Sequence, residues 1–346
     1  MPSREAVLEA LGRVIDPELR RPVTELDMVR EIEIENGRVA VTIALTVAGC
    51  PLRDSFQDQV AREVGPLEGV DEVALSFDVM TPEERAALTT KLRGGVEVRK
   101  GLSLAAATRV LAVCSGKGGV GKSTVTAALA VALSEQGSRV GVLDADIYGH
   151  SIPHLLGIHQ KPIAVDKMIV PPVKDDLKLM SIGFFLDDNQ PVMWRGPMLH
   201  RALEQFLSDV HWGELDVLVV DMPPGTGDVA ISLGQLLPRA EVLVVTTPQP
   251  AAQEVAARAA LMAQKTSMRL LGVVENMSGE VFGSGGGQRL ADELGVPLLG
   301  SIPLDPRLRE AGDLGEPLVT PEIEEIAERV GKLQPGGIVK PLTVLS

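Results

Sequence analysis

Hydrophobic residues near the start of the chain recur first at helical spacing and then in alternation. The spacing predicts a helix over residues 3–15, which Asp16-Pro17 ends. Alternation then predicts a hairpin, with strands over 29–34 and 38–47 joined at Asn36-Gly37, a dipeptide that favours a type I′ turn. Because the apolar residues of the second strand share one side, we expect one face of this hairpin to be buried.

A second helix and a third strand complete this pattern. Apolar residues four apart predict the helix over 52–64, and apolar residues two apart predict the strand over 73–79. The order α-β-β-α-β indicates a small α+β domain over residues 1–80. From 81 to 107 the pattern weakens into charges, glycines and small residues, which predicts a linker with one short helix over 83–92.

The remainder of the chain alternates short apolar strands with helices. Continuous apolar strands of this kind are typical of a mostly parallel sheet covered by helices on both faces. We therefore expect an α/β domain over residues 108–335, followed by a tail over 336–346. The predicted strands cover residues 110–114, 139–144, 216–221, 241–247 and 269–275.

A glycine-rich loop joins the first of these strands to a helix predicted over residues 122–135. It satisfies the pattern G-x-x-x-x-G-K-[ST], in which glycines let backbone N–H groups surround phosphates, so the fold class is that of a P-loop NTPase. Lys122 is expected to contact the β- and γ-phosphates, and Ser123 to ligate Mg²⁺. The residues predicted to bind the nucleotide here are Gly116, Lys117, Gly118, Gly119, Val120, Gly121, Lys122, Ser123 and Thr124.

The same glycines permit a competing interpretation. They also match G-x-G-x-x-G, and Asp144 follows at a strand end where a dinucleotide-binding fold places its ribose-binding carboxylate. Lys122-Ser123 favours the P-loop, because a dinucleotide loop has no use for that pair. Asp221 ends another apolar strand, at the Walker B position that holds Mg²⁺. The alternative for Asp221 is an ordinary turn at the end of a strand.

Composition narrows the possible functions further. The chain has 33 basic and 47 acidic residues, a formal net charge of −14, which disfavours contact with a phosphate backbone. Aromatic residues make up 3% of the chain, too few for a base-stacking surface. The charged start and the lack of a long apolar run predict neither a signal peptide nor a membrane span. We therefore expect a cytoplasmic protein with no nucleic-acid or membrane partner.

A second lysine in the loop and several motifs beyond it set this chain apart from most P-loop proteins. Lys117 places a charge beside the phosphates, where most such loops have none. The motifs are DADIYGHSIP (144–153), MWRGPM (193–198), DMPPGTGD (221–228), TTPQ (246–249), VENMSG (274–279) and IPLDP (302–306). In this combination the chain resembles the deviant Walker A ATPases, and among them the Mrp-type iron-sulfur cluster carriers. The likeness covers nearly all of residues 108–335.

The resemblance implies catalytic roles for individual residues. Lys117 would reach across a homodimer into the partner's nucleotide, as a lysine counterpart of an arginine finger. Asp146 would position the attacking water, while Asp144 and Asp221 would lie near the Mg²⁺. With Lys122 on the phosphates, the implied activity is a slow, Mg²⁺-dependent hydrolysis of ATP.

The resemblance also implies where the base of the nucleotide would lie. Asn276 and the turn over 302–306 would hold the adenine. Within that turn, Pro303 and Asp305 are the residues expected to contact it.

The small domain carries a resemblance of its own. Asp16-Pro17-Glu18, the hairpin and residues 46–51 around Cys50 resemble the metal-sulfur cluster biosynthesis domain, which is often fused ahead of these ATPases. Cys50 precedes a predicted helix, whose N-terminus favours the thiolate that attacks or binds metal. The alternative is a buried small hydrophobe, which is the interpretation we favour for Cys114 on the central strand.

The chain departs from the family at its usual cluster site. Carriers of this type place a Cys-x-x-Cys shortly after the Asn-Met-Ser motif, whereas residues 276–287 contain no cysteine. The chain has 2 cysteines and 5 histidines, so Cys50 from two protomers remains the nucleus for an iron-sulfur cluster. Because Pro153 interrupts any helix between His150 and His154, we interpret these as exposed residues rather than ligands.

These observations favour a homodimeric ATPase that delivers iron-sulfur clusters to apo-proteins or exchanges them with a cluster scaffold, using ATP and Mg²⁺. One alternative is an ATP-controlled adaptor that docks client proteins and binds no cluster itself. A positioning ATPase that acts on membranes or DNA is a third, but its related families rely on an amphipathic or basic surface that this sequence does not offer.

Overall fold

The structure of the chain is a computed structural model and describes residues 2–46, 53–93, 104–147, 149–185, 196–225 and 228–333. It divides into two compact units. The first contains Met1–Val96 and Ile163–Val170, and the second contains Glu97–Pro162 and Pro171–Ser346. A segment from within the α/β part of the chain therefore belongs to the first unit.

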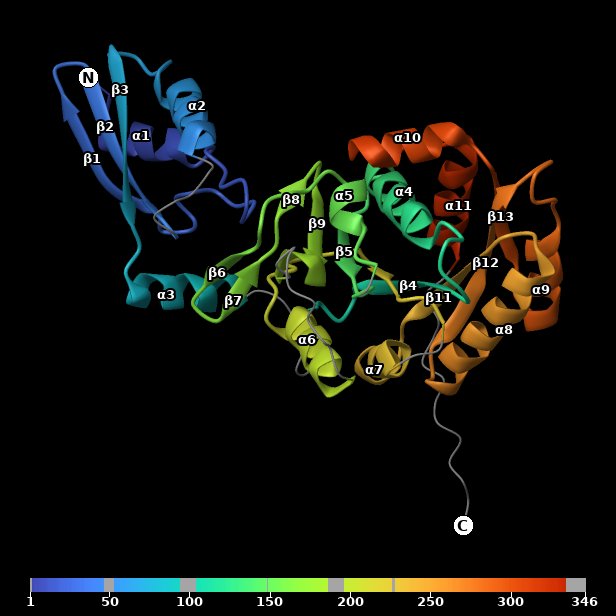
Figure 1. The fold of residues 1–346 in the computed structure, drawn as a ribbon. Helices are drawn as coiled ribbons and strands as arrows, with labels where there is room; N and C mark the ends of the chain where they lie inside the picture. The colour runs from blue at the N-terminus through green and yellow to red at the C-terminus, as the bar shows by residue number, and fades with distance from the viewer. Residues whose placement is uncertain are drawn as a thin grey trace. The chain divides into compact units, whose positions relative to one another are not determined.

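The first unit is built on a three-stranded sheet. β1 and β2 pair in antiparallel fashion, and β2 pairs with β3 in parallel. Asn36 and Gly37 both have positive φ, 47° and 82°, as a type I′ turn requires, which confirms the predicted hairpin. The elements are α1 (Arg4–Leu11), β1 (Val29–Glu35), β2 (Arg38–Leu45), α2 (Arg53–Val64), β3 (Glu72–Val79) and α3 (Pro82–Arg93), blue to teal in Figure 1.

The helix predicted over residues 3–15 ends earlier than its hydrophobic spacing suggests. α1 stops at Leu11. The following amides bond three residues back, from Arg13 N–H to the Ala10 carbonyl at 3.0 Å and from Val14 N–H to the Leu11 carbonyl at 3.1 Å. These tighter turns end the α-helix but keep Val14 fully buried, so the apolar face continues past the helix itself.

A short hairpin from the middle of the chain completes the core of the first unit. β6 (Ile163–Val165) and β7 (Met168–Val170) pair in antiparallel fashion. Val165, Met168 and Val170 are at most 2% exposed and share one apolar core with α3. Strands of three residues are too short to show a period, so the sequence pattern did not indicate them. The short helix predicted over residues 83–92, within the expected linker, is α3, and it packs in the first unit.

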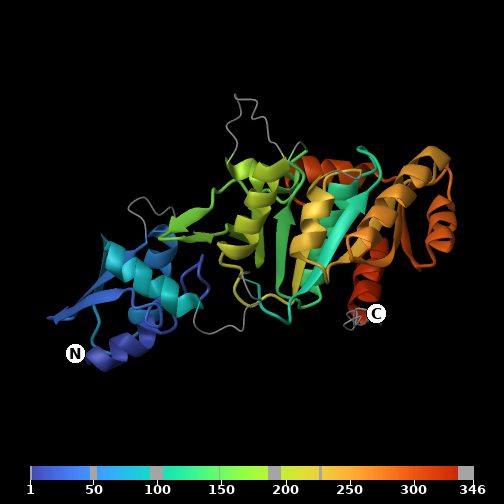
Figure 2. The ribbon, with the colours of Figure 1, turned by 90° about the horizontal axis from the view of Figure 1, so that it is seen from below.

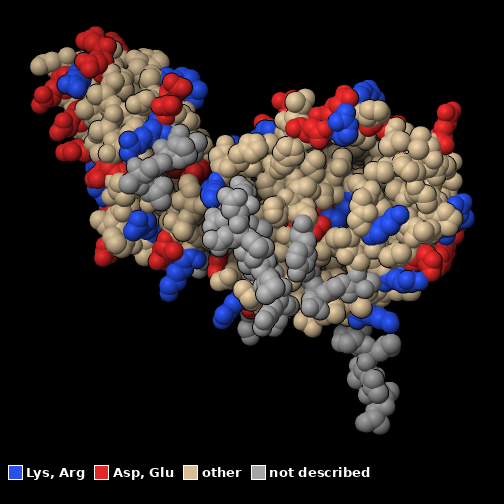
Figure 3. Space-filling model, in the orientation of Figure 1, with Lys and Arg blue, Asp and Glu red and all other residues tan. Residues whose placement is uncertain are grey.

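Three of the four exposed side chains of the edge strand β1 are acidic. Glu31, Glu33 and Glu35 are exposed, while Ile32 and Ile34 pack toward the core. Figure 3 shows acidic side chains gathered along this part of the first unit, with both signs interspersed elsewhere on the face drawn. Charged side chains on an edge strand discourage pairing with another chain.

Within the described residues, the second unit is an eight-stranded sheet in the order β13-β12-β11-β4-β10-β5-β9-β8. Neighbouring strands are parallel except for β8 with β9, which confirms the mostly parallel sheet. Its strands are β4 (Arg109–Ser115), β5 (Val140–Asp144), β8 (Val173–Lys174), β9 (Leu177–Ser181), β10 (Val217–Asp221), β11 (Glu241–Thr246), β12 (Arg269–Ser278) and β13 (Leu298–Pro303).

Helices cover both faces of this sheet, as predicted. One layer holds α4 (Lys122–Glu135), α5 (Ile152–Leu155), α10 (Pro306–Leu314) and α11 (Pro321–Lys332). The other holds α6 (Gly196–Ser208), α7 (Asp228–Leu236), α8 (Pro250–Lys265) and α9 (Gly286–Leu294), and Figure 2 shows α6 and α7 in front of the strands. None of the helices described is both long and apolar enough to cross a membrane.

Candidate functional site

The glycine-rich loop connects β4, in the middle of the sheet, to the N-terminus of α4. Gly119 and Gly121 have positive φ, 81° and 79°, which side chains disfavour. A Cβ at Gly116 would come within 2.2 Å of the Ala256 backbone, so close packing against α8 requires glycine there. At Gly118 and Gly119 a Cβ would meet nothing within 4 Å. The loop is therefore open at Gly118 and Gly119, and its N–H groups and the N-terminus of α4 can bind an anion.

Lys122 lies at the centre of a buried cluster at the carboxyl ends of the strands. Its Nζ is 2.6 Å from Oδ2 of Asp221 and 3.4 Å from Oδ2 of Asp146. Ser123 Oγ donates to Oδ2 of Asp221 at 2.7 Å, and Thr126 Oγ1 donates to Oδ1 at 2.8 Å. The fold thus brings together predicted residues from the loop, from β10 and from the segment after β5.

Asp144 faces the same cluster from the neighbouring strand β5, in register with Asp221 on β10. Ser181 Oγ donates to its Oδ2 at 2.9 Å, and the Asp146 N–H donates to its Oδ1 at 3.1 Å. Burial and the nearby Asp221 carboxylate raise the pKa of Asp144 to about 8. Burial also raises the pKa of Asp221, although Lys122 and the hydroxyls of Ser123 and Thr126 favour its charged form.

Lys117 lies apart from this cluster. Its side chain is exposed, whereas Lys122 in the same loop is 6% exposed. Ser115 Oγ donates to the Lys117 carbonyl at 3.1 Å, which fixes the backbone at the start of the loop. The two lysines are therefore available for different tasks.

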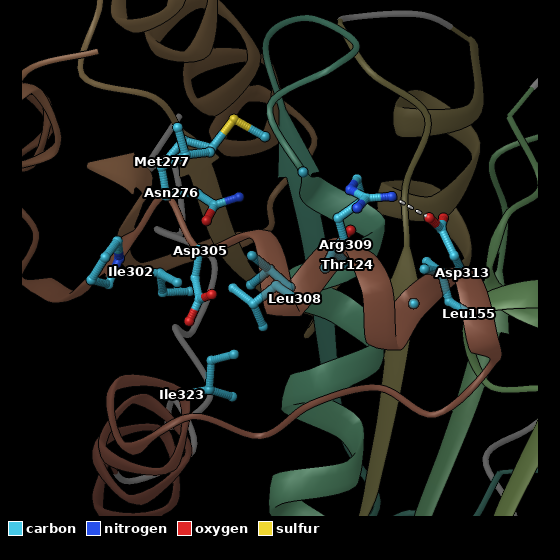
Figure 4. Close-up of a pocket in the computed structure, with 15 residues that line it drawn as sticks. Thr124, Leu155, Asn276, Met277, Ile302, Asp305, Leu308, Arg309, Asp313 and Ile323 are labelled. Atoms are coloured by element: carbon cyan, nitrogen blue, oxygen red, sulfur yellow. Dashed lines mark hydrogen bonds and ion pairs between the residues drawn. The ribbon is translucent and has the colours of Figure 1, made fainter. Parts of the chain in front are cut away.

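A pocket of about 340 Å³ lies beside the loop on the α4 face of the sheet. It is lined by three of the residues predicted to hold adenine, Asn276, Pro303 and Asp305, and by Thr124. Figure 4 shows Asn276 directed from β12 toward the loop before α4, where its Nδ2 donates to the Val120 carbonyl at 2.9 Å. The structure thus places the predicted base-binding and phosphate-binding residues side by side.

Asp305 also has a local structural task. It caps α10 by accepting from the Arg307 N–H at 2.9 Å, and it pairs with the Arg307 guanidinium at 2.6 Å. These hydrogen bonds hold the pKa of Asp305 below its usual range. Three further lining residues, Leu155, Leu308 and Ile323, were not predicted, because apolar positions on α5, α10 and α11 carry no motif.

The predicted cluster ligand, Cys50, falls outside the described residues. Cys114 is fully enclosed on β4, and burial raises the pKa of its thiol to about 12, as suits the interpretation of a core residue. His150 and His154 are both exposed. In the part of the chain that the structure describes, no three His, Cys, Asp or Glu side chains are arranged to hold a metal ion.

Two protein-family models match the chain. Residues 106–334 match the NUBPL iron-transfer P-loop NTPase model, and residues 4–75 match a model described as an iron-sulfur cluster assembly protein. The first match covers the second unit from the strand before the loop to the last helix. The second covers α1, β1, β2 and α2 and ends within β3.

The chain is also similar to relatives over most of its length. The chain is 54% identical over 337 residues to a protein of Mycobacterium leprae, covering 91% of this chain and 87% of that protein. It is 41% identical over 345 residues to a protein of Synechocystis, covering 95% of each. Both relatives are named iron-sulfur cluster carrier protein.

Solved structures match 60–65% of the chain. A nucleotide-binding protein from Archaeoglobus fulgidus in complex with ADP is 39% identical with a TM-score of 0.53, over 60% of this chain and 86% of that one. The septum site-determining protein MinD of Pyrococcus horikoshii, complexed with Mg-ADP, is 25% identical with a TM-score of 0.51, over 65% of this chain and 96% of that one.

Proposed function

The chain belongs to the family of NUBPL-type iron-transfer P-loop NTPases and iron-sulfur cluster carrier proteins, and from this premise we propose a specific cycle for it. In this cycle the second unit of a homodimer binds ATP with Mg²⁺ and hydrolyses it slowly. Nucleotide turnover controls the delivery of an iron-sulfur cluster to apo-proteins or its exchange with a scaffold. The observation that carries the nucleotide part is the convergence of Lys122, Ser123 and Asp221 beneath an open glycine loop.

The donor set fits Mg²⁺ and a triphosphate. Ser123 and Asp221 supply the hydroxyl and carboxylate oxygens that Mg²⁺ prefers, and they already lie 2.7 Å apart. When bound, Mg²⁺ neutralises charge on the β- and γ-phosphates. Lys122 would exchange Asp221 for the phosphates, and Asp146 would orient the attacking water. The water oxygen forms a bond to the γ-phosphorus while the bond between that phosphorus and the β–γ bridging oxygen breaks, so that ADP leaves. The proton released by the water remains on the phosphate product.

The pocket chemistry favours adenine over guanine. A carbonyl can accept only from the amide nitrogen of Asn276, so the bond to Val120 leaves Oδ1 as the acceptor. An acceptor suits the exocyclic amino group of adenine and opposes the O6 oxygen of guanine. Discrimination of this kind relies on a buried polar group, and Asn276 is 5% exposed.

The exposed position of Lys117 supports action on a second protomer. Its neighbour Lys122 already occupies the buried side of the loop, so the exposed ammonium is free to approach a nucleotide across an interface. A positive charge supplied only in the closed dimer would stabilise the transition state more than the bound substrate, which is the condition for catalysis.

The proposed iron-sulfur cluster site differs from the Cys-x-x-Cys site that carriers of this type usually have. With Cys114 enclosed in the core and no cysteine in 276–287, cluster binding depends on Cys50. Two protomers supply two thiolates, and a client or another ligand supplies the rest, which gives an exposed and labile cluster suited to transfer.

Anaerobic reconstitution with iron and sulfide tests this assignment. Wild type and a Cys114→Ala control should gain iron, sulfide and a charge-transfer absorption band, whereas Cys50→Ser should gain none. Transfer to an apo-ferredoxin should then depend on ATP. A Cys50→Ser protein that holds as much iron as wild type would refute the cluster site. If wild type itself gains no iron but still hydrolyses ATP, the adaptor function without a cluster is the better description.

A further inference from the structure

Glu275 is a buried carboxylate at the end of β12 that joins three parts of the second unit. It is 2% exposed. Its Oε1 accepts from the Gly285 N–H at 3.1 Å and from Ser301 Oγ at 3.0 Å, and its Oε2 accepts from the Gly287 N–H at 2.6 Å. The two amides belong to the N-terminus of α9, where a negative charge is favoured, and Ser301 lies on β13.

The close approach of α9 to this carboxylate depends on glycine. A Cβ at Gly287 would lie 2.6 Å from the Cβ of Glu275, and one at Gly286 would lie 2.5 Å from the Pro248 carbonyl. Real Cβ atoms do not approach so closely, so the glycine run lets the helix N-terminus reach Glu275. The Glu275 carboxylate and these glycines therefore form one contact between β12 and the N-terminus of α9.

The pairing of β12 with β13 shifts once between Val273 and Val274 and again directly after Glu275. Glu275 pairs with Ser301, but the next pair joins Ser278 to Pro303, so β12 carries one extra residue. Met277 within this bulge has φ of 58°, an uncommon value for a residue with a side chain. The irregular backbone thus follows immediately after the residue that the three hydrogen bonds hold.

The bulge accounts for a feature of the pocket that a regular strand does not allow. Consecutive residues of a strand point to opposite faces, yet Asn276 and Met277 both line the same pocket. Figure 4 shows the two side chains together at the end of β12. Because of the bulge, the polar amide of Asn276 and the apolar side chain of Met277 can both line the pocket.

We propose that Glu275 is the positioning residue for nucleobase specificity. It clamps β12 to β13 and to α9 just before the bulge, and so holds Asn276 in the orientation that accepts from adenine. Glu275 does not line the pocket and acts only through its neighbours. This inference rests on the proposed binding of ATP in the second unit.

Glu275→Gln tests the clamp with little change of size. The amide of glutamine has one acceptor oxygen, so its nitrogen faces N–H donors and at least one amide of α9 loses its partner. We expect the KM for ATP to rise about tenfold and the preference for ATP over GTP to fall about as much, because a misplaced buried polar group forfeits its hydrogen bond. The kcat at saturating ATP should change less than about twofold, since Glu275 makes no hydrogen bond to Lys122, Ser123 or Asp221.

Glu241→Gln is the matched control. Glu241 is also a strand carboxylate at 2% exposure, but it pairs with Arg109 and Arg269 at the start of β11. Its loss should lower the unfolding temperature of the protein and leave the ATP-to-GTP ratio as in wild type. Ser301→Ala removes one donor from Glu275 and should shift the ratio two- to threefold, about the effect of one weak hydrogen bond. This milder variant decides the question if Glu275→Gln does not fold.

The outcomes separate this inference from the function on which it rests. If wild type shows no ATP binding by calorimetry, the proposed nucleotide function fails. If wild type prefers ATP and Glu275→Gln or Ser301→Ala keeps the same ratio, the positioning role of Glu275 is refuted. An equal loss of ATP and GTP binding in Glu275→Gln would also refute it, because a merely structural role affects both nucleotides alike.

Discussion

The ammonium group of Lys122 lies 2.6 Å from the carboxylate of Asp221, and both side chains are buried. The lysine expected on the phosphates thus pairs in this structure with the carboxylate expected at Mg²⁺. When nucleotide and Mg²⁺ bind together, the phosphates would replace Asp221 as the partner of Lys122. Mg²⁺ would replace Lys122 as the partner of Asp221. This relationship defines what each lysine of the loop should do.

Substitution of each lysine should separate binding from catalysis. Lys122→Ala should abolish tight ATP binding. It should also cost about 3–5 kcal/mol of folding stability, because it leaves Asp221 buried without its partner. Lys117→Ala should retain binding and stability but lower kcat at least about a thousandfold, the smallest effect expected for a charge supplied in trans. Calorimetric ATP titration, thermal unfolding and phosphate release measure these effects. Wild-type hydrolysis by Lys117→Ala would contradict the trans mechanism.

ATP with Mg²⁺ should drive closure of a dimer. Lys117 is exposed in its own protomer and can serve a nucleotide only where two loops face each other. Sedimentation velocity should show a shift from monomer, or loose dimer, to compact dimer upon addition of ATP and Mg²⁺. Lys122→Ala should show no shift. Full activity of a strictly monomeric protein at saturating nucleotide would rule the proposal out.

Asp144 should make the nucleotide-free protein less stable as pH rises. Its pKa lies at about 8 in the folded chain, against an ordinary value of 3.8 for aspartate, so between these values only the folded state keeps the proton. Stability from this group is complete below about pH 4 and lost as pH passes about 8. Without Mg²⁺, Asp144→Asn should therefore exceed wild type in stability by about 3.5 kcal/mol more at pH 8 than at pH 5, since each pH unit between the two pKa values is worth about 1.4 kcal/mol.

Urea unfolding in the presence of EDTA at the two pH values measures this difference. Asp216→Asn is the control with the opposite sign. Hydrogen bonds from Arg139 lower the pKa of Asp216, so its contribution to stability is lost only in acid. A wild-type-like pH profile in Asp144→Asn would show that Asp144 is already charged in the folded chain.

The two cysteines should differ in reactivity. Burial raises the pKa of Cys114 to about 12, so at about pH 8 only about one thiol in ten thousand is ionised. Cys50, which precedes α2 in sequence, should alkylate first because a helix N-terminus favours the thiolate. Mass spectrometry after brief iodoacetamide treatment gives the order. Equal labelling of both cysteines in native protein would remove this argument.

Met168 should matter to the stability of the first unit even though it lies far along the chain. It is 1% exposed in the core of that unit, and Met168→Ala should cost about 2–5 kcal/mol. Met198→Ala, at a side chain 49% exposed, should cost less than about 0.5 kcal/mol. Hydrogen exchange of peptides from α1 and β2 should accelerate only in the first variant. Unchanged exchange there would mean that the hairpin is dispensable for the core.

The sequence by itself determined the features that depend on neighbouring residues. Gly116 to Ser123 predicted the loop and the start of α4, because glycine conformation and a helix N-terminus are local properties. Asn36-Gly37 predicted its hairpin for the same reason. The apolar strands before Asp144 and Asp221 were long enough to show that they are buried on both faces, and this indicated a parallel sheet.

Only the tertiary structure decided the features that join distant segments. β6 and β7 are too short to show a period, and nothing in their residues indicates which core they enter. β9 and β13 were missed as well. The clamp at Glu275 is likewise not visible in sequence, since a carboxylate in an apolar strand gives no sign of its partners. Its donors come from α9 and β13, and only the packing of those elements brings them within hydrogen-bonding distance.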